Sequence, residues 1–331
     1  MPASIPLDRV RALLAKASRL RVLAVGDAML DVYLTGDVER ISPEAPVPVV
    51  RVRERREAMG GAANVAQNVV AAGAACSLVA ALGRDSAGLA LRSGLRHIGV
   101  TDASLIEVER RTTRKTRIVA RSQQLVRFDE EVDAALHQEE EERLLEAIRS
   151  AVATADAVIL EDYNKGVVTP AVIREVLALA RGRGIPVIVD PKLANFFAFS
   201  GATVFKPNRR ELEGALGQPV DVDDPRALLA VLARLGSSHL LLTLGEAGMV
   251  LCSETGDVER FPAAARQVYD VVGAGDTVSA YLAVILAAGG TMVEAAFIAN
   301  LAAGIEVSKL GAATVPAAEL LELVTELYND S

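Results

Sequence analysis

Short apolar runs alternate with longer amphipathic segments along most of the chain. The apolar runs predict buried strands at 21–26, 77–81, 157–160, 186–189, 203–206 and 240–243. Helical periodicity predicts helices at 61–72, 87–97, 139–154, 170–183 and 225–235. This alternation is typical of β-α-β units in an α/β fold with a mainly parallel, doubly wound sheet flanked by helices. Because such folds bind ligands at the carboxyl ends of their strands, we look for candidate chemistry there.

Two segments interrupt the alternation. Residues 32–52 form two extended stretches around three prolines that exclude a helix, and residues 112–129 are strand-like with Gln123 and Gln124 at a turn. We expect both to pair into one small antiparallel β lid, inserted at about 32–54 and 112–129 within a single domain spanning 1–331. Three helical patterns follow one another from 275 to 327, and no linker divides the chain.

Composition narrows the possible partners. The 331 residues include 35 Lys+Arg and 43 Asp+Glu, a net charge of -8, which argues against nucleic acid and anionic membranes as partners. Cys76 and Cys252 both lie in apolar runs, as expected of reduced core residues in a cytoplasmic protein. Neither a cleavable leader nor an apolar stretch of about 18 residues is expected from the pattern.

The motif with the clearest chemistry is Asp-Val-Val-Gly-Ala-Gly-Asp at 270–276, which precedes a helical run. Small residues before a helix let backbone N–H groups approach an anion, and the helix N-terminus favours negative charge there. Asp276 would repel that anion, so we interpret it as a general base beside an anion hole. For this segment taken alone, an ordinary loop with an Asp N-cap is the alternative.

Two weaker features accompany this motif. Gly60 and Gly61 open a predicted helix with Asn64 one turn in, which could bring backbone and amide groups against a polyhydroxylated ligand. Asp27 and Asp31 follow the first predicted strand, where carboxylates could accept hydrogen bonds from sugar hydroxyls or be solvated loop acids.

Together, the segments at 60–64 and 270–276 resemble the two signatures of the PfkB/ribokinase family of carbohydrate kinases, and the likeness runs from about Arg21 to the C-terminus. Residues 26–31, 40–50 and 123–125 resemble most closely the D-glycero-β-D-manno-heptose-7-phosphate 1-kinases of lipopolysaccharide-core synthesis. Those kinases are sometimes fused to an adenylyltransferase. Because the three histidines are isolated and form no His-x-Gly-His segment, we expect the kinase alone.

The resemblance implies roles for individual residues in catalysis and nucleotide binding. Asp276 would accept the proton of the anomeric hydroxyl as it attacks ATP, while the N–H groups of Gly273, Ala274 and Gly275 would form the anion hole. Mg²⁺ would be held largely by the nucleotide and water. The positions matching nucleotide contacts are Asn208, Arg209, Arg210, Glu211, Thr243, Gly245 and Asn300. Without the resemblance, these segments also fit a Pro-Asn turn, a hairpin turn and a helix-packing face.

The resemblance also implies a sugar side and a cation site. The matching sugar contacts are Asp31, Gly60, Gly61 and Asn64. Met29 stands where ribokinase has a sugar-binding Asn, which argues against a ribose-like pose. Asp270 and the carbonyl of Val272 match a monovalent-cation site, so K⁺ is a candidate cofactor beside ATP and Mg²⁺.

A second phosphate on the sugar would need cations. Lys165 and Lys192 follow strand ends, which point into the cleft, and we expect them to bind substrate. Further basic residues cluster around the lid, where solvated surface charge is the alternative: Arg110, Arg111, Arg114, Lys115, Arg117, Arg121 and Arg127.

The resemblance therefore implies an ATP-dependent kinase that converts the heptose 7-phosphate to its 1,7-bisphosphate. A family kinase for a hexose phosphate or free sugar, and a catalytically silent sugar-binding regulator, are the alternatives. Because the lid strands have exposed edges, we expect a homodimer through the lid.

Overall fold

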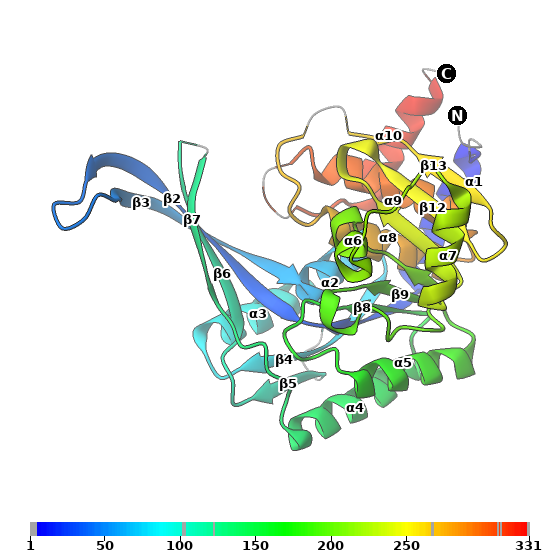
Figure 1. The fold of residues 1–331 in the computed structure, drawn as a ribbon, viewed down its shortest axis with the longest axis horizontal. Coiled ribbons are helices and arrows are strands. Elements are labelled where there is room, and N and C mark those ends of the chain that lie inside the picture. Colours follow the sequence, from blue (N-terminus) through cyan, green and yellow to red (C-terminus); the bar gives the residue numbers. More distant parts are fainter. Residues whose placement is uncertain are drawn as a thin grey trace.

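A nine-stranded sheet forms the body in the computed structural model, which describes residues 5–100, 104–121, 123–265, 268–309, 311 and 313–329 (Figure 1). In spatial order its strands are β13 (Val258–Phe261), β12 (Met249–Ser253), β11 (His239–Thr243), β10 (Val204–Phe205), β9 (Val187–Asp190), β8 (Ala157–Glu161), β1 (Arg21–Gly26), β4 (Ala75–Gly83) and β5 (Leu105–Val108). Strands β11 to β5 of this order are parallel, whereas β12 and β13 are antiparallel to their neighbours. The predicted mainly parallel α/β sheet is confirmed.

Helices cover both faces of this sheet because side chains alternate along each strand. In β1, Val22 and Ala24 belong to the core of one face and Leu23 and Val25 to that of the other. The first face packs against α1 (Leu7–Lys16), α2 (Ala62–Ala71), α3 (Ser86–His97), α8 (Ala274–Ala287), α9 (Met292–Glu306) and α10 (Ala317–Asn329). The second face packs against α4 (Gln138–Val152), α5 (Pro170–Arg183), α6 (Arg209–Leu216) and α7 (Pro225–Leu235).

Each strand and helix predicted for the body has a counterpart whose ends lie within a few residues of the prediction, whereas the lid strand predicted to end at 52 continues to Gly61. The three predicted C-terminal helices correspond to α8, α9 and α10. Three strands were not predicted: β5, β12 and β13, which are four or five residues long. These strands lie at the two ends of the sheet order, where short segments carry little periodicity.

A second sheet of four strands forms the lid, in the order β3 (Pro48–Gly61), β2 (Ala28–Ile41), β6 (Thr113–Ala120) and β7 (Gln123–Glu130). Figure 1 shows its two hairpins extending away from the body. The expectation of a purely antiparallel lid is wrong, because β2 and β6 pair in parallel. They are joined through β3, α2, β4, α3 and β5 rather than by a hairpin, so both leave the body in the same direction.

The remaining sequence features concern the core. Cys76 and Cys252 are both buried and free, as expected of core residues, and burial raises the pKa of the Cys76 thiol to about 12. Within the described ranges, no helix has both the length and the apolar character needed to cross a bilayer.

Candidate active site

The candidate site lies at the carboxyl ends of β8, β9 and β10, where a cavity of about 690 Å³ opens. Its walls come from the segments after these strands, the β11–β12 hairpin and the N-terminus of α8. This is the edge at which a doubly wound sheet gathers its ligands. The structure therefore brings residues from the middle and the end of the chain into one cavity.

The first turn of α8 forms one wall of the cavity. Gly273 precedes the helix with φ +98°, a left-handed conformation that favours glycine, and no side chain caps the helix. The predicted residues Gly273, Ala274, Gly275 and Asp276 all line the cavity. The N-terminal N–H groups of an uncapped helix suit an anion, and Asp276 lies in that same turn rather than at the N-cap.

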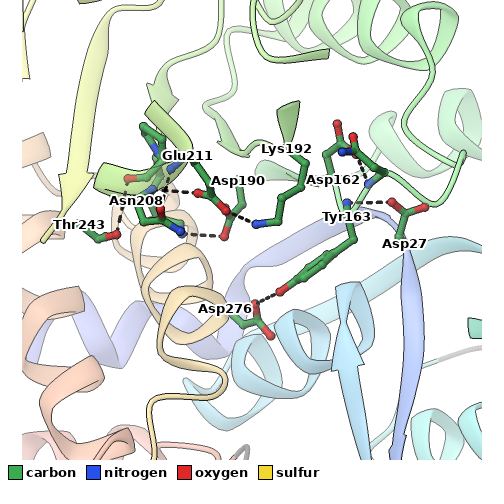
Figure 2. Close-up of polar contacts among 12 residues, drawn as sticks. Asp27, Asp162, Tyr163, Asp190, Lys192, Asn208, Glu211, Thr243 and Asp276 are labelled. Carbon is green, nitrogen blue, oxygen red and sulfur yellow. Dashed lines mark hydrogen bonds and ion pairs between the residues drawn. The ribbon is translucent and has the colours of Figure 1, made fainter. Parts of the chain in front are cut away.

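Asp276 is held by hydrogen bonds from two other elements. Asn64 Nδ2 on α2 donates to Asp276 Oδ2 at 2.7 Å. The Tyr163 hydroxyl donates to Oδ1 at 3.1 Å, as Figure 2 shows. The Asp276 residue is only 5% exposed. Burial raises the pKa of its carboxyl from 3.8 to about 6, against the opposing effect of the Asn64 hydrogen bond. Asp276 is therefore mostly ionised at neutral pH, yet it binds a proton more readily than an ordinary aspartate does. A general base needs both properties.

A buried charge cluster surrounds Asp276. Glu161 and Asp190 end β8 and β9, and Lys206 follows β10; its Nζ donates to Asp190 Oδ2 at 2.6 Å. Desolvation lowers the pKa of Lys206, but the charges of Asp190 and Glu161 outweigh it, so the ammonium stays charged. Burial, reinforced by the charge of Asp190, raises the pKa of Glu161 well above its usual range. The cluster places one buried cation beside the helix turn.

Three buried carboxylates meet beside this helix turn. They belong to Glu161, Asp190 and Asp276, and one oxygen of each lies within 4.8 Å of those of the others. The Lys206 ammonium already supplies a cation to this cluster, so we assign no metal to it. Oxygen donors suited to Mg²⁺ with a nucleotide occur instead at Asn208 and Glu211, which line the same cavity.

The predicted nucleotide contacts divide into two groups. Asn208, Glu211, Thr243, Gly245 and Asn300 line the cavity, whereas Arg209 and Arg210 do not. Asn208 and Glu211 also form the capping box of α6, as the alternative Pro-Asn reading implied. Arg209 instead pairs with Glu213 on the same helix at 3.1 Å. Residues 208–211 thus begin α6, and two of the four, Asn208 and Glu211, line the cavity.

Asn300 and Thr243 hold two other parts of the cavity wall. Asn300 Nδ2 donates to the carbonyl of Pro262 at 2.8 Å, which ties α9 to the segment after β13. Thr243 N donates to the carbonyl of Pro207 at 3.1 Å, and Thr243 pairs with Asn208 as an isolated bridge. Asn300 is therefore held by its side chain and Thr243 by its main chain, each through a backbone carbonyl.

On the predicted sugar side, the buried Asp31 lies in β2 and forms an ion pair with the partly buried Arg117 of β6. Gly60 faces Asp31 closely: a methyl group on Gly60 would lie 2.4 Å from Asp31 Oδ2. Gly61 precedes α2, the helix that carries Asn64. The structure thus gathers Asp31, Gly60, Gly61 and Asn64 at the junction of lid and body, with Asn64 already bound to the candidate base.

The two predicted substrate lysines lie in different surroundings. Lys192 lines the cavity and pairs with Glu211, on the nucleotide side. Lys165 does not line the cavity, and its Nζ lies 2.6 Å from Asp133 Oδ1 and 2.9 Å from Glu131 Oε1. Its ammonium is thus paired with two carboxylates of the segment after β7, and its contact with substrate stays a prediction.

Most lid arginines are paired with carboxylates. Glu130 binds Arg111 and Arg114, and Asp129 binds Arg127. The ammonium of Lys115 lies 5.2 Å from the centre of the Tyr163 ring.

Asp27 differs from both readings of the sequence. It is 1% exposed and accepts backbone N–H groups from Tyr163, Lys165 and Val167 at 2.8, 3.0 and 3.1 Å. It is neither a solvated loop acid nor a sugar ligand, but the anchor of the segment after β8.

Sequence reasoning did not assign functional roles to Tyr163, Glu161, Asp190 or Lys206. All four lie at the carboxyl end of a strand or within two residues of it. Applying the strand-end rule to acids and aromatics, and not only to lysines, would have found them.

Residues 19–318 match the family model described as pfkB family carbohydrate kinase. The chain is 47% identical over 322 residues to the bifunctional protein HldE of Rhodospirillum rubrum, covering 96% of this chain and 65% of that protein. Over 330 residues it is 43% identical to the bifunctional protein HldE of Trichlorobacter lovleyi, covering 98% and 67%. The chain thus spans about two thirds of the length of these relatives.

Solved structures share the fold. The ribokinase of Arabidopsis thaliana, solved with ribose and ATP, has a TM-score of 0.73 at 21% identity and covers 92% of this chain and 98% of its own. Phosphofructokinase-2 of Escherichia coli, solved with potassium, has a TM-score of 0.78 at 20% identity, with coverage of 93% and 99%.

Proposed function

The chain belongs to the pfkB family of carbohydrate kinases, and we propose that it transfers the γ-phosphoryl group of ATP to O1 of D-glycero-β-D-manno-heptose 7-phosphate. The product would be the 1,7-bisphosphate used in ADP-heptose and lipopolysaccharide-core synthesis. Support comes from the resemblance of residues 26–31, 40–50 and 123–125 to heptose kinases and from the identity to HldE proteins. The observation that carries the proposal is the buried Asp276 carboxylate, oriented by two donors beside the glycine turn of α8.

The geometry suits an in-line transfer to a hydroxyl. Asp276 would take the proton from the anomeric O–H while O1 forms a bond to the γ-phosphorus and the bond from that phosphorus to the β–γ bridging oxygen breaks, releasing ADP. General-base assistance is worth about 10²–10⁴-fold, so positioning and charge neutralisation must supply the rest. The N–H groups of Gly273, Ala274 and Gly275 and the Lys206 ammonium supply positive charge beside the base.

Asn208 and Glu211 are the residues that we propose to contact Mg²⁺ with its nucleotide, through water. When bound, the ion would neutralise phosphate charge. Thr243, Gly245 and Asn300 would line the remainder of the nucleotide site. Because Glu211 also binds Lys192, a carboxylate and an ammonium are available together where phosphate oxygens and a metal would meet.

We also propose a monovalent cation at Asp270 and the carbonyl of Val272. Asp270 accepts the N–H groups of Val272 and Gly311 at 3.0 and 3.2 Å, which gathers this loop around one carboxylate. Glu306 is fully buried nearby, and burial raises its pKa to about 8. A cation there would favour its ionised form. Replacing potassium by tetramethylammonium in the assay should lower turnover; equal rates would remove the cation from the proposal.

A substrate panel tests the proposed function. Release of ADP is measured with heptose 7-phosphate, fructose 6-phosphate and fructose, with Asp276→Asn as the matched control. Heptose 7-phosphate should have the highest kcat/KM. Preference for a hexose phosphate or free sugar would leave a family kinase of different specificity, and absence of turnover with every sugar would favour the sugar-binding regulator.

We propose a homodimer through the lid in the cytoplasm. Apolar side chains are exposed on the edge strand β7, at Leu125, Val126 and Phe128, and the free thiols of the chain suit a reducing compartment. Light scattering tests the dimer: a monomeric mass at micromolar concentration would contradict it.

A further inference from the structure

Tyr163 connects the candidate base to the segment that follows β8. Its hydroxyl donates to Asp276 Oδ1 at 3.1 Å, and its backbone N–H donates to Asp27 Oδ2 at 2.8 Å. Figure 2 shows the ring reaching from the Asp27 side of the site toward Asp276. One residue thus joins a structural carboxylate to a reactive one.

The backbone around Tyr163 is tightly fixed. Asp27 accepts three N–H groups from residues 163–167, and Asn164 N donates to Asp162 Oδ1 at 2.8 Å. Asn164 has φ +55°, which is uncommon for a residue with a side chain and persists only where its surroundings impose it. The direction of the Tyr163 side chain is therefore set by this anchored turn.

Cations hold the ring of Tyr163 as well. The ammonium of Lys192 lies 4.9 Å from the ring centre and that of Lys115 lies 5.2 Å from it. Ammonium groups at this distance are attracted to an aromatic ring. These contacts depend on the ring and not on the hydroxyl, so the hydroxyl can be removed without removing them.

A second chain of hydrogen bonds reaches the other oxygen of Asp276. Thr277 Oγ1 donates to Asn68 Oδ1 at 3.1 Å, and Asn68 Nδ2 donates to the Asn64 carbonyl at 3.1 Å. Asn64 in turn donates to Asp276 Oδ2. Each carboxylate oxygen therefore has one fixed donor, which sets the plane of the group and leaves lone pairs for a substrate hydroxyl.

We propose that Tyr163 is the positioning residue that orients the Asp276 carboxylate toward the acceptor hydroxyl. The inference rests on the base role of Asp276 in the proposed function, but not on which sugar is phosphorylated. The other charged groups that act on Asp276 lie on different elements: Glu161 at the end of β8, Asp190 at the end of β9, Lys206 after β10 and Glu306 on α9. None of them makes the Oδ1 contact that Tyr163 makes.

Tyr163→Phe tests the proposal because it removes one oxygen and keeps the ring. With the sugar phosphate that the wild type uses best, kcat should fall about tenfold or more, since hydrogen bonds to charged groups are among the stronger ones. KM for sugar and ATP should stay within about twofold. The acidic limb of the kcat profile should move to higher pH, because a carboxylate that loses a donor holds its proton more tightly.

Two controls separate orientation from packing. Tyr328→Phe removes a hydroxyl that donates to the carbonyl of Ile5, and its profile should match the wild type. In an Asp276→Asn background, Tyr163→Phe should have no further effect on residual turnover. An unchanged kcat, a lower kcat with an unmoved acidic limb, a loss confined to KM, or additive losses in the double variant would each overturn the proposal.

A titration that needs no turnover keeps this test separate from the proposed function. Burial, followed by the charge of Asp276, raises the pKa of the Tyr163 phenol well above its ordinary value. The near-ultraviolet difference between wild type and Tyr163→Phe identifies this phenol. In Asp276→Asn it should ionise at lower pH, and an unchanged phenol titration would refute the contact even in a chain that phosphorylates nothing.

Discussion

Replacing Asp276 by Asn should make the protein more stable while it abolishes most of its turnover. Burial raises the pKa of this carboxyl from 3.8 to about 6, so the folded chain binds the proton more tightly than the unfolded chain does. Tighter proton binding stabilises the folded chain relative to the unfolded chain. This stabilisation is fully present below about pH 4 and is lost as the pH rises through about 6.

The magnitude follows from the shift. The shift of the pKa from 3.8 to about 6 corresponds to about 3 kcal/mol. Above pH 6 the ionised carboxylate destabilises the folded state by this amount. Asn has nearly the same shape, can accept the Asn64 hydrogen bond through its oxygen and can donate to the Tyr163 hydroxyl. We therefore expect a gain in unfolding free energy of up to about 3 kcal/mol near neutral pH.

Urea denaturation of wild type and variant measures this gain. The difference should be present at about pH 7.5 and should vanish near pH 4, where both side chains are neutral. ATP binding should be retained while kcat falls by about 10²–10⁴-fold. A variant that is less stable at neutral pH, or equally stabilised at both pH values, would refute the burial argument, and near-normal turnover would remove Asp276 from the base role.

Three further measurements, one on the wild type and two on variants, test other parts of the site. In the wild type, kcat/KM should fall about tenfold for each pH unit below about 6, and a limb near pH 4 would contradict a buried base. A methyl group on Gly275 would meet Lys206 Nζ at 3.4 Å and Asp190 Oδ2 at 3.6 Å, both ordinary contacts. Gly275→Ala should therefore melt like the wild type but lose about tenfold or more in kcat, and normal turnover would argue against phosphoryl transfer at this turn. Lys206→Met leaves buried carboxylates without their cation and should lower the free energy of unfolding in urea by about 3–5 kcal/mol. Adding Asp190→Asn should restore part of this loss. If it restores none, the Lys206–Asp190 pair is not the cause of the loss.

Local sequence patterns predicted the body strands β1, β4, β8, β9, β10 and β11, because their apolar runs are buried on both faces, as in β1 and β8. The pairing within the lid was not predictable in the same way. Strand polarity between β2 and β6 depends on the path of the chain between them, which no pattern inside either strand records.

The site shows the same division. Asp276 and the turn at 273–275 were predicted because the turn and the helix start are adjacent in sequence. Tyr163 lies 113 residues before Asp276, and only the folded sheet brings its hydroxyl to the carboxylate. The pairing of Lys165 with Glu131 and Asp133 was likewise not predictable, because these carboxylates lie more than thirty residues earlier in the chain.

The parallel pairing of β2 with β6 also constrains how this protein folds and how it could be rearranged. The segment between these strands includes β4, which pairs with β1 in the body. The two central lid strands therefore meet only after a long crossover has been ordered, a non-local pairing of the kind that slows folding. For the same reason the lid is not an exchangeable cassette: removing residues 28–130 as a block would also remove β4 and β5 from the main sheet.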